Sequence, residues 1–296
     1  MNGLLVIDKP GGMTSHDVVD RLRRITGERS IGHLGTLDPM ATGVLPLLMG
    51  KYTRLAQYFS AAEKSYCGDI RLGFATDTYD ADGEPAGPDR WMEMEEAVTV
   101  EQVRAAAARF HGEMQQMPPA FSAKKIHGKP AYKLAREGKP VELKTAKIRI
   151  DSFEIAALEG SEVSFTIDIS SGGYVRSVAH ELGQDLGCGA HLSRLRRARA
   201  GMFTLEDAHT LEELEALAGI SDALQAACVH PRLLLPELPS VTADTTALGR
   251  LRNGAQANLP EFSTASLVKV FVGPRELAAI AKRVAGTLFQ PVLVMG

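Results

Sequence analysis

One glycine-rich loop carries the two residues whose types and spacing point most directly to chemistry. Asp38 offers a carboxylate and His33 a titratable ring, within residues 32–45, which read G-H-L-G-T-L-D-P-M-A-T-G-V-L. Three glycines and a proline in its first twelve positions exclude a regular helix or a central strand. A carboxylate held in such a shaped loop can act as a nucleophile or as a base.

Residue chemistry alone leaves structural interpretations of both side chains open. An Asp-Pro pair such as Asp38-Pro39 is typical of a helix N-cap or a turn, because the carboxylate accepts an orphan backbone N–H and proline is preset for the first helical position. A single loop histidine such as His33 is commonly a hydrogen-bonded structural residue.

The loop resembles the catalytic signature of the pseudouridine synthases, in the TruB-type form G-H-x-G-x-L-D-P-x-A-T-G-x-L. The resemblance implies that Asp38 is catalytic and that the chain isomerises uridine to pseudouridine at position 55 in the T loop of tRNA. It implies that His33 fills or braces the space left by the flipped base. This isomerisation needs no cofactor and no metal ion, because no oxidation occurs and no group is lost.

Three further segments extend the resemblance and supply the other site residues. Tyr66 lies 28 residues after Asp38, as does the family's tyrosine that stacks on the base. The turn G-G-Y-V-R-S resembles the family pattern G-x-Y-[IV]-R-[ST], which implies that Tyr174 and Arg176 flank the aspartate. Leu195 matches a leucine that closes the base pocket. A guanidinium favours an ionised carboxylate beside it, so we expect Arg176 to be the partner of Asp38.

Charge is unevenly distributed along a chain of net charge −3. Residues 77–101 contain nine acids and one base, whereas residues 121–149 contain nine Lys or Arg and two acids. Local fields rather than the total charge attract phosphate. We therefore expect contacts with the RNA backbone from Lys124, Lys125, Lys129, Arg196 and Arg197, although solvated surfaces of no function would have the same composition.

Composition excludes several other classes of protein. The apolar runs are far shorter than the roughly 20 residues of a membrane span, and the N-terminus lacks the features of a secretory signal. The three cysteines form no C-x-x-C pair. The acidic run at 77–83 lacks the glutamate that a calcium loop requires, so we interpret it as a turn. Composition therefore predicts a cytoplasmic protein that holds no metal, and the family resemblance implies a monomer whose partner is tRNA.

Periodicity and capping residues predict the elements that position these side chains. Apolar or alternating runs predict strands over 4–7, 66–74, 148–155 and 163–169, and helices beginning at Thr14 or Ser15, at Thr99 and at Val178. The family resemblance implies an α+β fold, with a mixed or antiparallel sheet flanked by helices in a catalytic domain over 1–235. A proline-rich linker precedes residues 240–296, where the family carries a small PUA-like β domain that binds RNA, whereas the composition of Glu276–Val284 favours a helix.

Two other functions fit part of the sequence. A glycosidase also attacks an anomeric carbon, but it normally needs two carboxylates, and the loop offers only Asp38. A non-catalytic tRNA-binding protein or RNA chaperone would need the basic segments without Asp38 and Arg176 in their motifs. Whether Asp38 attacks C1′ or removes a ribose proton stays open at the level of sequence.

Overall fold

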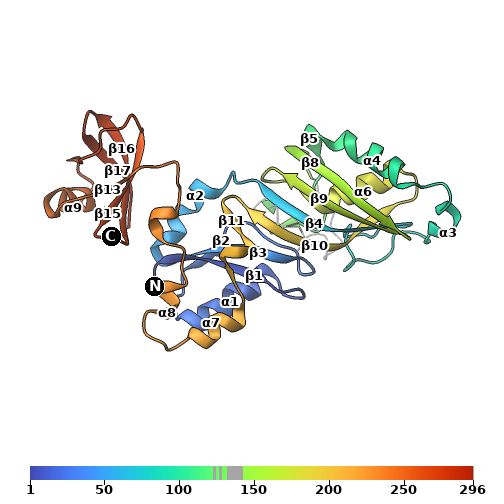
Figure 1. Cartoon of the computed structure of the whole chain (residues 1–296), viewed down its shortest axis with the longest axis horizontal. Helices are drawn as coiled ribbons and strands as arrows, with labels where there is room; N and C mark the ends of the chain where they lie inside the picture. Colours follow the sequence, from blue (N-terminus) through green and yellow to red (C-terminus); the bar gives the residue numbers. More distant parts are fainter. Residues whose placement is uncertain (123–124, 127–128, 132–142, 296) are drawn as a thin grey trace.

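A ten-stranded sheet forms the body of the molecule (Figure 1). The computed structural model describes residues 1–122, 125–126, 129–131 and 143–295. The strands follow the order β12-β1-β3-β10-β4-β9-β8-β5, with β2 paired to β3 and β11 paired to β10. They are β1 (Gly3–Lys9), β2 (Ile31–His33), β3 (Thr42–Met49), β4 (Lys64–Leu72), β5 (Gly112–Gln116), β8 (Ala146–Glu159), β9 (Glu162–Ile169), β10 (Ala190–Ala200), β11 (Phe203–Thr204) and β12 (Ala208–His209).

The sheet is mixed, which confirms the expected α+β fold. β1 runs parallel to β12 and β3 runs parallel to β10, whereas the other neighbouring pairs in the sheet are antiparallel. In the β3–β10 pair, Thr42 lies opposite Arg196 and Gly43 opposite Arg197. This register brings the loop that precedes β3 next to the middle of β10.

Helices cover the sheet in two groups (Figure 1). α1 (Ser15–Thr26) and α7 (Leu211–Leu217) lie together beside β1, while α4 (Val100–Ala107) and α6 (Val175–Asp185) lie against β8 and β10. The shorter helices are η1 (Gly50–Leu55), α2 (Ala56–Phe59), α3 (Trp91–Met94), η2 (Ala108–Phe110), η3 (Leu205–Asp207), α8 (Ala223–Ala226) and η4 (Pro231–Leu233). No helix among the described residues is long and apolar enough to cross a membrane.

Local sequence accounts for where the main helices begin. Thr14 caps α1 and Thr99 caps α4, each in a capping box, and α1 ends at Gly27 in the left-handed conformation. The predicted helix at Val178 begins three residues earlier, at Val175, so Arg176 lies in the first turn of α6. Alternation along β4 buries Tyr66, as predicted.

A second, five-stranded sheet contains the C-terminal residues, in the order β13-β15-β16-β17-β14. Its elements are β13 (Ser240–Thr242), α9 (Thr245–Arg252), β14 (Ala257–Asn258), β15 (Leu267–Val272), β16 (Glu276–Ala285) and β17 (Leu288–Val294). The helix expected over Glu276–Val284 is therefore wrong. This alanine-rich segment pairs with β15 on one side and β17 on the other, and tertiary pairing overrides its helix propensity.

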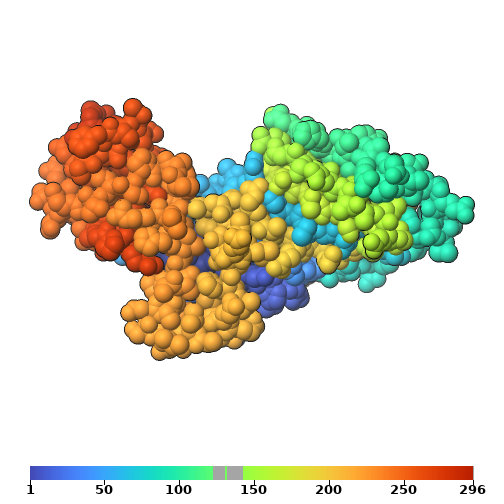
Figure 2. Space-filling view, viewed as in Figure 1, coloured from blue at the N-terminus to red at the C-terminus, as the bar shows by residue number. Residues whose placement is uncertain are grey.

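The C-terminal sheet packs directly on the ten-stranded sheet, and Figure 2 shows its lobe against one end of the molecule. One apolar cluster contains side chains from both parts, among them Tyr52 and Phe59 from the η1–α2 segment and Phe271 from β15. The buried Lys269 also joins the two parts, because its Nζ donates to the carbonyl oxygens of Arg232 and Leu234 at 2.8 and 2.6 Å.

Candidate active site

The loop between β2 and β3 holds Asp38 by contacts to its backbone neighbours. The Leu37 N–H donates to Ser15 Oγ at 2.8 Å, and Ser15 Oγ donates back to the Leu37 carbonyl at 3.1 Å. On the other side, Lys9 Nζ and the Gly12 N–H donate to the Pro39 carbonyl. No helix begins at Asp38, whose carbonyl accepts from the Ala41 N–H in a turn. The N-cap interpretation of Asp38 is therefore wrong.

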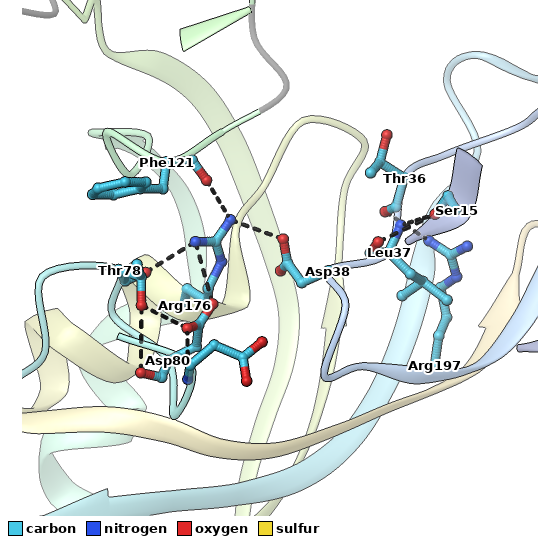
Figure 3. A network of polar contacts seen from close by, with 10 residues as sticks. Ser15, Thr36, Leu37, Asp38, Thr78, Asp80, Phe121, Arg176 and Arg197 are labelled. Carbon is cyan, nitrogen blue, oxygen red and sulfur yellow. Dashed lines mark hydrogen bonds and ion pairs between the residues drawn. The ribbon is translucent and has the colours of Figure 1, made fainter. Parts of the chain in front are cut away.

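Arg176 meets Asp38 through a direct ion pair (Figure 3). Its Nη2 lies 2.9 Å from Asp38 Oδ1 and also donates to the Phe121 carbonyl at 2.9 Å. Nη1 donates to the Thr78 carbonyl at 2.9 Å and lies 3.4 Å from Asp80 Oδ2. The guanidinium is thus held by two carboxylates and two carbonyls, and its side chain is only 4% exposed.

Opposing influences act on the ionisation of Asp38. Burial raises the pKa of its carboxyl group, because a low-dielectric environment disfavours the charged form. The Arg176 guanidinium acts in the opposite direction and lowers that pKa, while the nearby Asp80 raises it. Arg176 is therefore the group that favours an ionised Asp38 in this pocket.

Asp38 lines a pocket of about 430 Å³. The pocket is lined by the residues that the sequence predicts to be catalytic or to bind the substrate: His33, Asp38, Tyr66, Tyr174, Arg176 and Leu195. These side chains come from two loops, three strands and the start of a helix. The fold therefore brings together residues that are up to 162 positions apart, from 33 to 195.

Tyr174, His33 and Tyr66 line the pocket in different environments. Gln116 at the end of β5 fixes the backbone of Tyr174, accepting from its N–H at 2.8 Å and donating to its carbonyl at 3.0 Å. Burial lowers the pKa of His33, which favours the neutral imidazole. Tyr66 is 8% exposed and lines the pocket.

The residues expected to contact the RNA backbone fall into three groups. Lys124 and the side chains of Lys125 and Lys129 lie outside the described residues. Arg196 forms a bidentate ion pair with Asp8, at 2.7 and 3.0 Å, and its side chain is 38% exposed.

Arg197 does not fit the expected contact with phosphate, because it is 1% exposed. Its guanidinium donates to the carbonyls of Val44 and Gly35, at 2.7 and 3.0 Å. The expected contact is wrong because β10 directs this side chain under the Asp38 loop. There its guanidinium donates to backbone carbonyls instead of phosphate.

The sequence analysis did not single out three residues in or next to the pocket, of which Lys64 lines it. Asp80 lies in the acidic run that was interpreted as a turn, and only the fold shows that it faces Arg176. Lys9 ends β1 beneath the Asp38 loop, and Lys64 begins β4 at the pocket wall. Burial lowers the pKa of each lysine from 10.5 to about 8. Of these three residues, only Lys9 had a signal in the sequence that could have identified it, because it ends an apolar strand.

The chain matches two family models and several named relatives. Residues 23–175 match the TruB family pseudouridylate synthase (N terminal domain), and residues 176–236 match the tRNA pseudouridylate synthase B C-terminal domain. The chain is 45% identical to the tRNA pseudouridine synthase B of Solibacter usitatus over the full length of both chains. It is 41% identical to the enzyme of the same name from Arthrobacter sp., over 99% of this chain and 96% of the other.

A solved structure resembles the whole fold. The Cbf5-Nop10-Gar1 complex contains a chain that superimposes with a TM-score of 0.71 at 26% identity, covering 99% of this chain and 85% of that one. The family match and the full-length relatives together lead to one conclusion. The chain belongs to the TruB family of pseudouridylate synthases.

Proposed function

We propose that this protein converts uridine to pseudouridine at position 55 in the T loop of tRNA. The observation that carries the proposal is the ion pair between Asp38 and Arg176 at one wall of a pocket with an aromatic side chain beside it. The relatives named tRNA pseudouridine synthase B support tRNA as the substrate class. The resemblance of the Asp38 loop to the TruB-type signature supports the T loop and position 55.

The reaction breaks the bond between N1 and C1′, turns the uracil and joins C5 to C1′. The target base must leave the RNA stack, which costs a few kcal/mol. Stacking on one aromatic ring recovers about 1–3 kcal/mol, and Tyr66 is the ring that we assign to this role. Leu195 closes the base pocket, and His33 takes the space that the base vacates.

Asp38 is the group that acts at the sugar, either by attack on C1′ or by removing a ribose proton. Both routes need the ionised carboxylate of Asp38. Arg176 favours this ionised form, because its Nη2 lies 2.9 Å from Asp38 Oδ1. Tyr174 lies against the ribose or the base, and its pKa is raised by burial, which favours the protonated phenol. Tyr66 or a basic residue of the pocket handles the proton at C5.

The rest of the chain supplies RNA binding. We propose a catalytic domain over 1–235 and an RNA-binding, PUA-like domain over 240–296. The boundary is supported by the family matches, which end at 236, and by the separate sheet that begins at Ser240. A monomer is sufficient for catalysis, because one chain supplies Asp38, Arg176 and Tyr66. A tRNA substrate would make the cytoplasm its place of action.

The test is an assay of the purified protein with an unmodified tRNA transcript and no added cofactor. Carbodiimide treatment and primer extension then map pseudouridine. We expect one stop, in the T loop, that is absent with the variant Asp38→Asn, although this variant still binds the transcript. A stop that persists with Asp38→Asn contradicts the role of Asp38. Tight binding without any stop would favour a non-catalytic RNA chaperone instead.

A further inference from the structure

Tyr79 has a backbone conformation that its residue type disfavours. Its φ is +65°, in the left-handed region, which glycine and asparagine adopt far more readily than tyrosine. Such a conformation persists only where the surrounding structure enforces it, and it is concentrated at functional sites. Two other non-glycine residues in the described part of the chain share a positive φ, Asp222 and Leu235.

Two kinds of contact hold Tyr79 in this conformation. Its ring stacks on the imidazole of His180, with centroids 3.8 Å apart and planes inclined by 13°. Its backbone joins β10, because the Leu192 N–H donates to the Tyr79 carbonyl at 3.0 Å. The loop is closed by a bond from Thr76 Oγ1 to the Asp80 carbonyl at 2.7 Å.

The left-handed turn at Tyr79 lies between Thr78 and Asp80, which both approach Arg176 in Figure 3. The Thr78 carbonyl precedes the turn and the Asp80 carboxylate follows it, yet both contact the same Nη1 atom, at 2.9 and 3.4 Å. Extended or right-handed backbone at Tyr79 would direct these two groups away from a common point. The conformation therefore shapes the binding site of the guanidinium, formed by the Thr78 carbonyl and the Asp80 carboxylate, which we call the Thr78–Asp80 socket.

His180 connects this socket to the helix that carries the guanidinium. It lies four residues after Arg176 on α6, one helical turn further along. Its buried Nδ1 has no hydrogen-bond partner, so polar contacts of that atom do not account for a histidine at this position. Its Nε2 lies within hydrogen-bonding distance of Gln184 Nε2, at 3.0 Å on the same helix, and the face of its ring packs against Tyr79.

We propose that Tyr79 and His180 are positioning residues that hold the Thr78–Asp80 socket in register with α6 and so keep Arg176 directed at Asp38. The proposal rests on the proposed function, which assigns the chemistry to Asp38. Neither residue lines the pocket, so neither is expected to touch the substrate. Their loss should slow the chemical step and leave RNA affinity unchanged.

The experiment measures the single-turnover rate of pseudouridine formation, and separately the Kd for the tRNA transcript, with the full chain. We expect Tyr79→Ala and His180→Ala each to reduce the rate at least tenfold and to change Kd less than twofold. The double variant should be no more than twofold slower than either single variant, because both remove the same stack. Tyr79→Phe should restore the rate to within twofold of the unchanged protein.

Two controls separate this role from a general effect on folding. Asp222→Gly relaxes a positive φ at an exposed site away from the pocket and should leave the rate unchanged. Tyr79→Gly accepts the left-handed conformation without steric cost but lacks the ring, and it replaces Tyr79→Ala if that variant does not fold. A rate within twofold for Tyr79→Gly overturns the proposal, as do additive effects in the double variant or equal losses of rate and affinity.

A failure of the proposed function gives a different result. In that case the unchanged protein forms no pseudouridine in tRNA, and the positioning role is decided by a crystal structure of Tyr79→Gly. Loss of the contact between Arg176 Nη1 and the Thr78 carbonyl supports the role. Retention of that contact overturns it.

Discussion

Arg176 and Arg197 are two buried arginines on the wall of one pocket, and they differ in what they contact (Figure 3). Arg176 contacts two carboxylates, Asp38 and Asp80, besides two carbonyls. Arg197 donates to the carbonyls of Gly35, Thr36 and Val44, and no carboxylate pairs with it among the described residues.

The difference separates two tasks that the same residue type performs. Next to carboxylates, a guanidinium changes which protonation state is stable, so Arg176 acts on the chemistry of Asp38. Next to carbonyls, a guanidinium satisfies several acceptors with a rigid fork of donors, so Arg197 acts on the shape of the loop. Lys9 resembles Arg197, because its Nζ donates to the carbonyls of Pro10, Met13 and Pro39.

The largest effect should follow Arg176→Ala. Removal of a preorganised charge at a reacting group costs about 10²–10³-fold in rate, and we expect a loss near the upper end, with RNA affinity unchanged. The pKa of Asp38, already raised by burial, should rise further without the guanidinium. The acidic limb of the pH–rate profile should therefore move to higher pH, and Arg176→Lys should move it less. A limb that stays in place would contradict the assigned role.

A smaller effect on rate and a clear effect on stability should follow Arg197→Met. The Val44 carbonyl that it leaves without this donor takes part in a buried hydrogen bond, and the Gly35 carbonyl in a partly buried one, so we expect the free energy of unfolding to fall by about 2–4 kcal/mol. The rate should fall about tenfold as the loop shifts. Denaturant unfolding and single-turnover assays measure the two effects.

Arg196→Met is the matched control for Arg197→Met, because it removes a half-exposed ion pair worth about 1 kcal/mol or less. The salt dependence of RNA binding distinguishes the two possible roles of Arg197. We expect it to be unchanged in Arg197→Met. A flatter salt dependence at unchanged stability would restore the phosphate contact that the sequence suggested.

The smallest effect on rate should follow Lys9→Met, which we expect to be a few-fold. Burial lowers the pKa of Lys9 to about 8 from 10.5, so between these values the unfolded chain binds a proton that the folded chain does not. The free energy of unfolding of the unchanged protein should therefore rise with pH across this window, relative to Lys9→Met, by roughly 1–3 kcal/mol. If the free energy of unfolding changes with pH in the same way for both proteins, Lys9 keeps an ordinary pKa.

The sequence predicted the parts of the site that depend on contiguous residues. The Asp38 loop, the strand that buries Tyr66 and the turn before Arg176 each have a local signature, and the fold brings all three to one pocket. The predicted approach of Arg176 to Asp38 is confirmed at 2.9 Å. The capping residues Thr14 and Thr99 also identified the helix starts correctly.

What the sequence could not provide depends on tertiary contacts. An arginine that binds phosphate and one that binds buried carbonyls look identical in sequence, so Arg197 was assigned to RNA. Asp80 and Tyr79 lie in an acidic run whose composition indicates a turn, and the direction of that turn toward Arg176 requires the packing of β10 and α6. The Glu276–Ala285 strand shows the same limitation, because its pairing partners override its alanine content.

The apolar cluster shared by the two sheets affects how a shortened chain should be interpreted. Phe59 belongs to this cluster and also lines the pocket, and Phe271 and Leu293 of the C-terminal sheet cover the same cluster. A chain cut after residue 236 would expose this surface to water and remove support from the wall behind the substrate. Lost activity in such a fragment would therefore report damage to the pocket as well as the absence of the part that we propose to bind RNA.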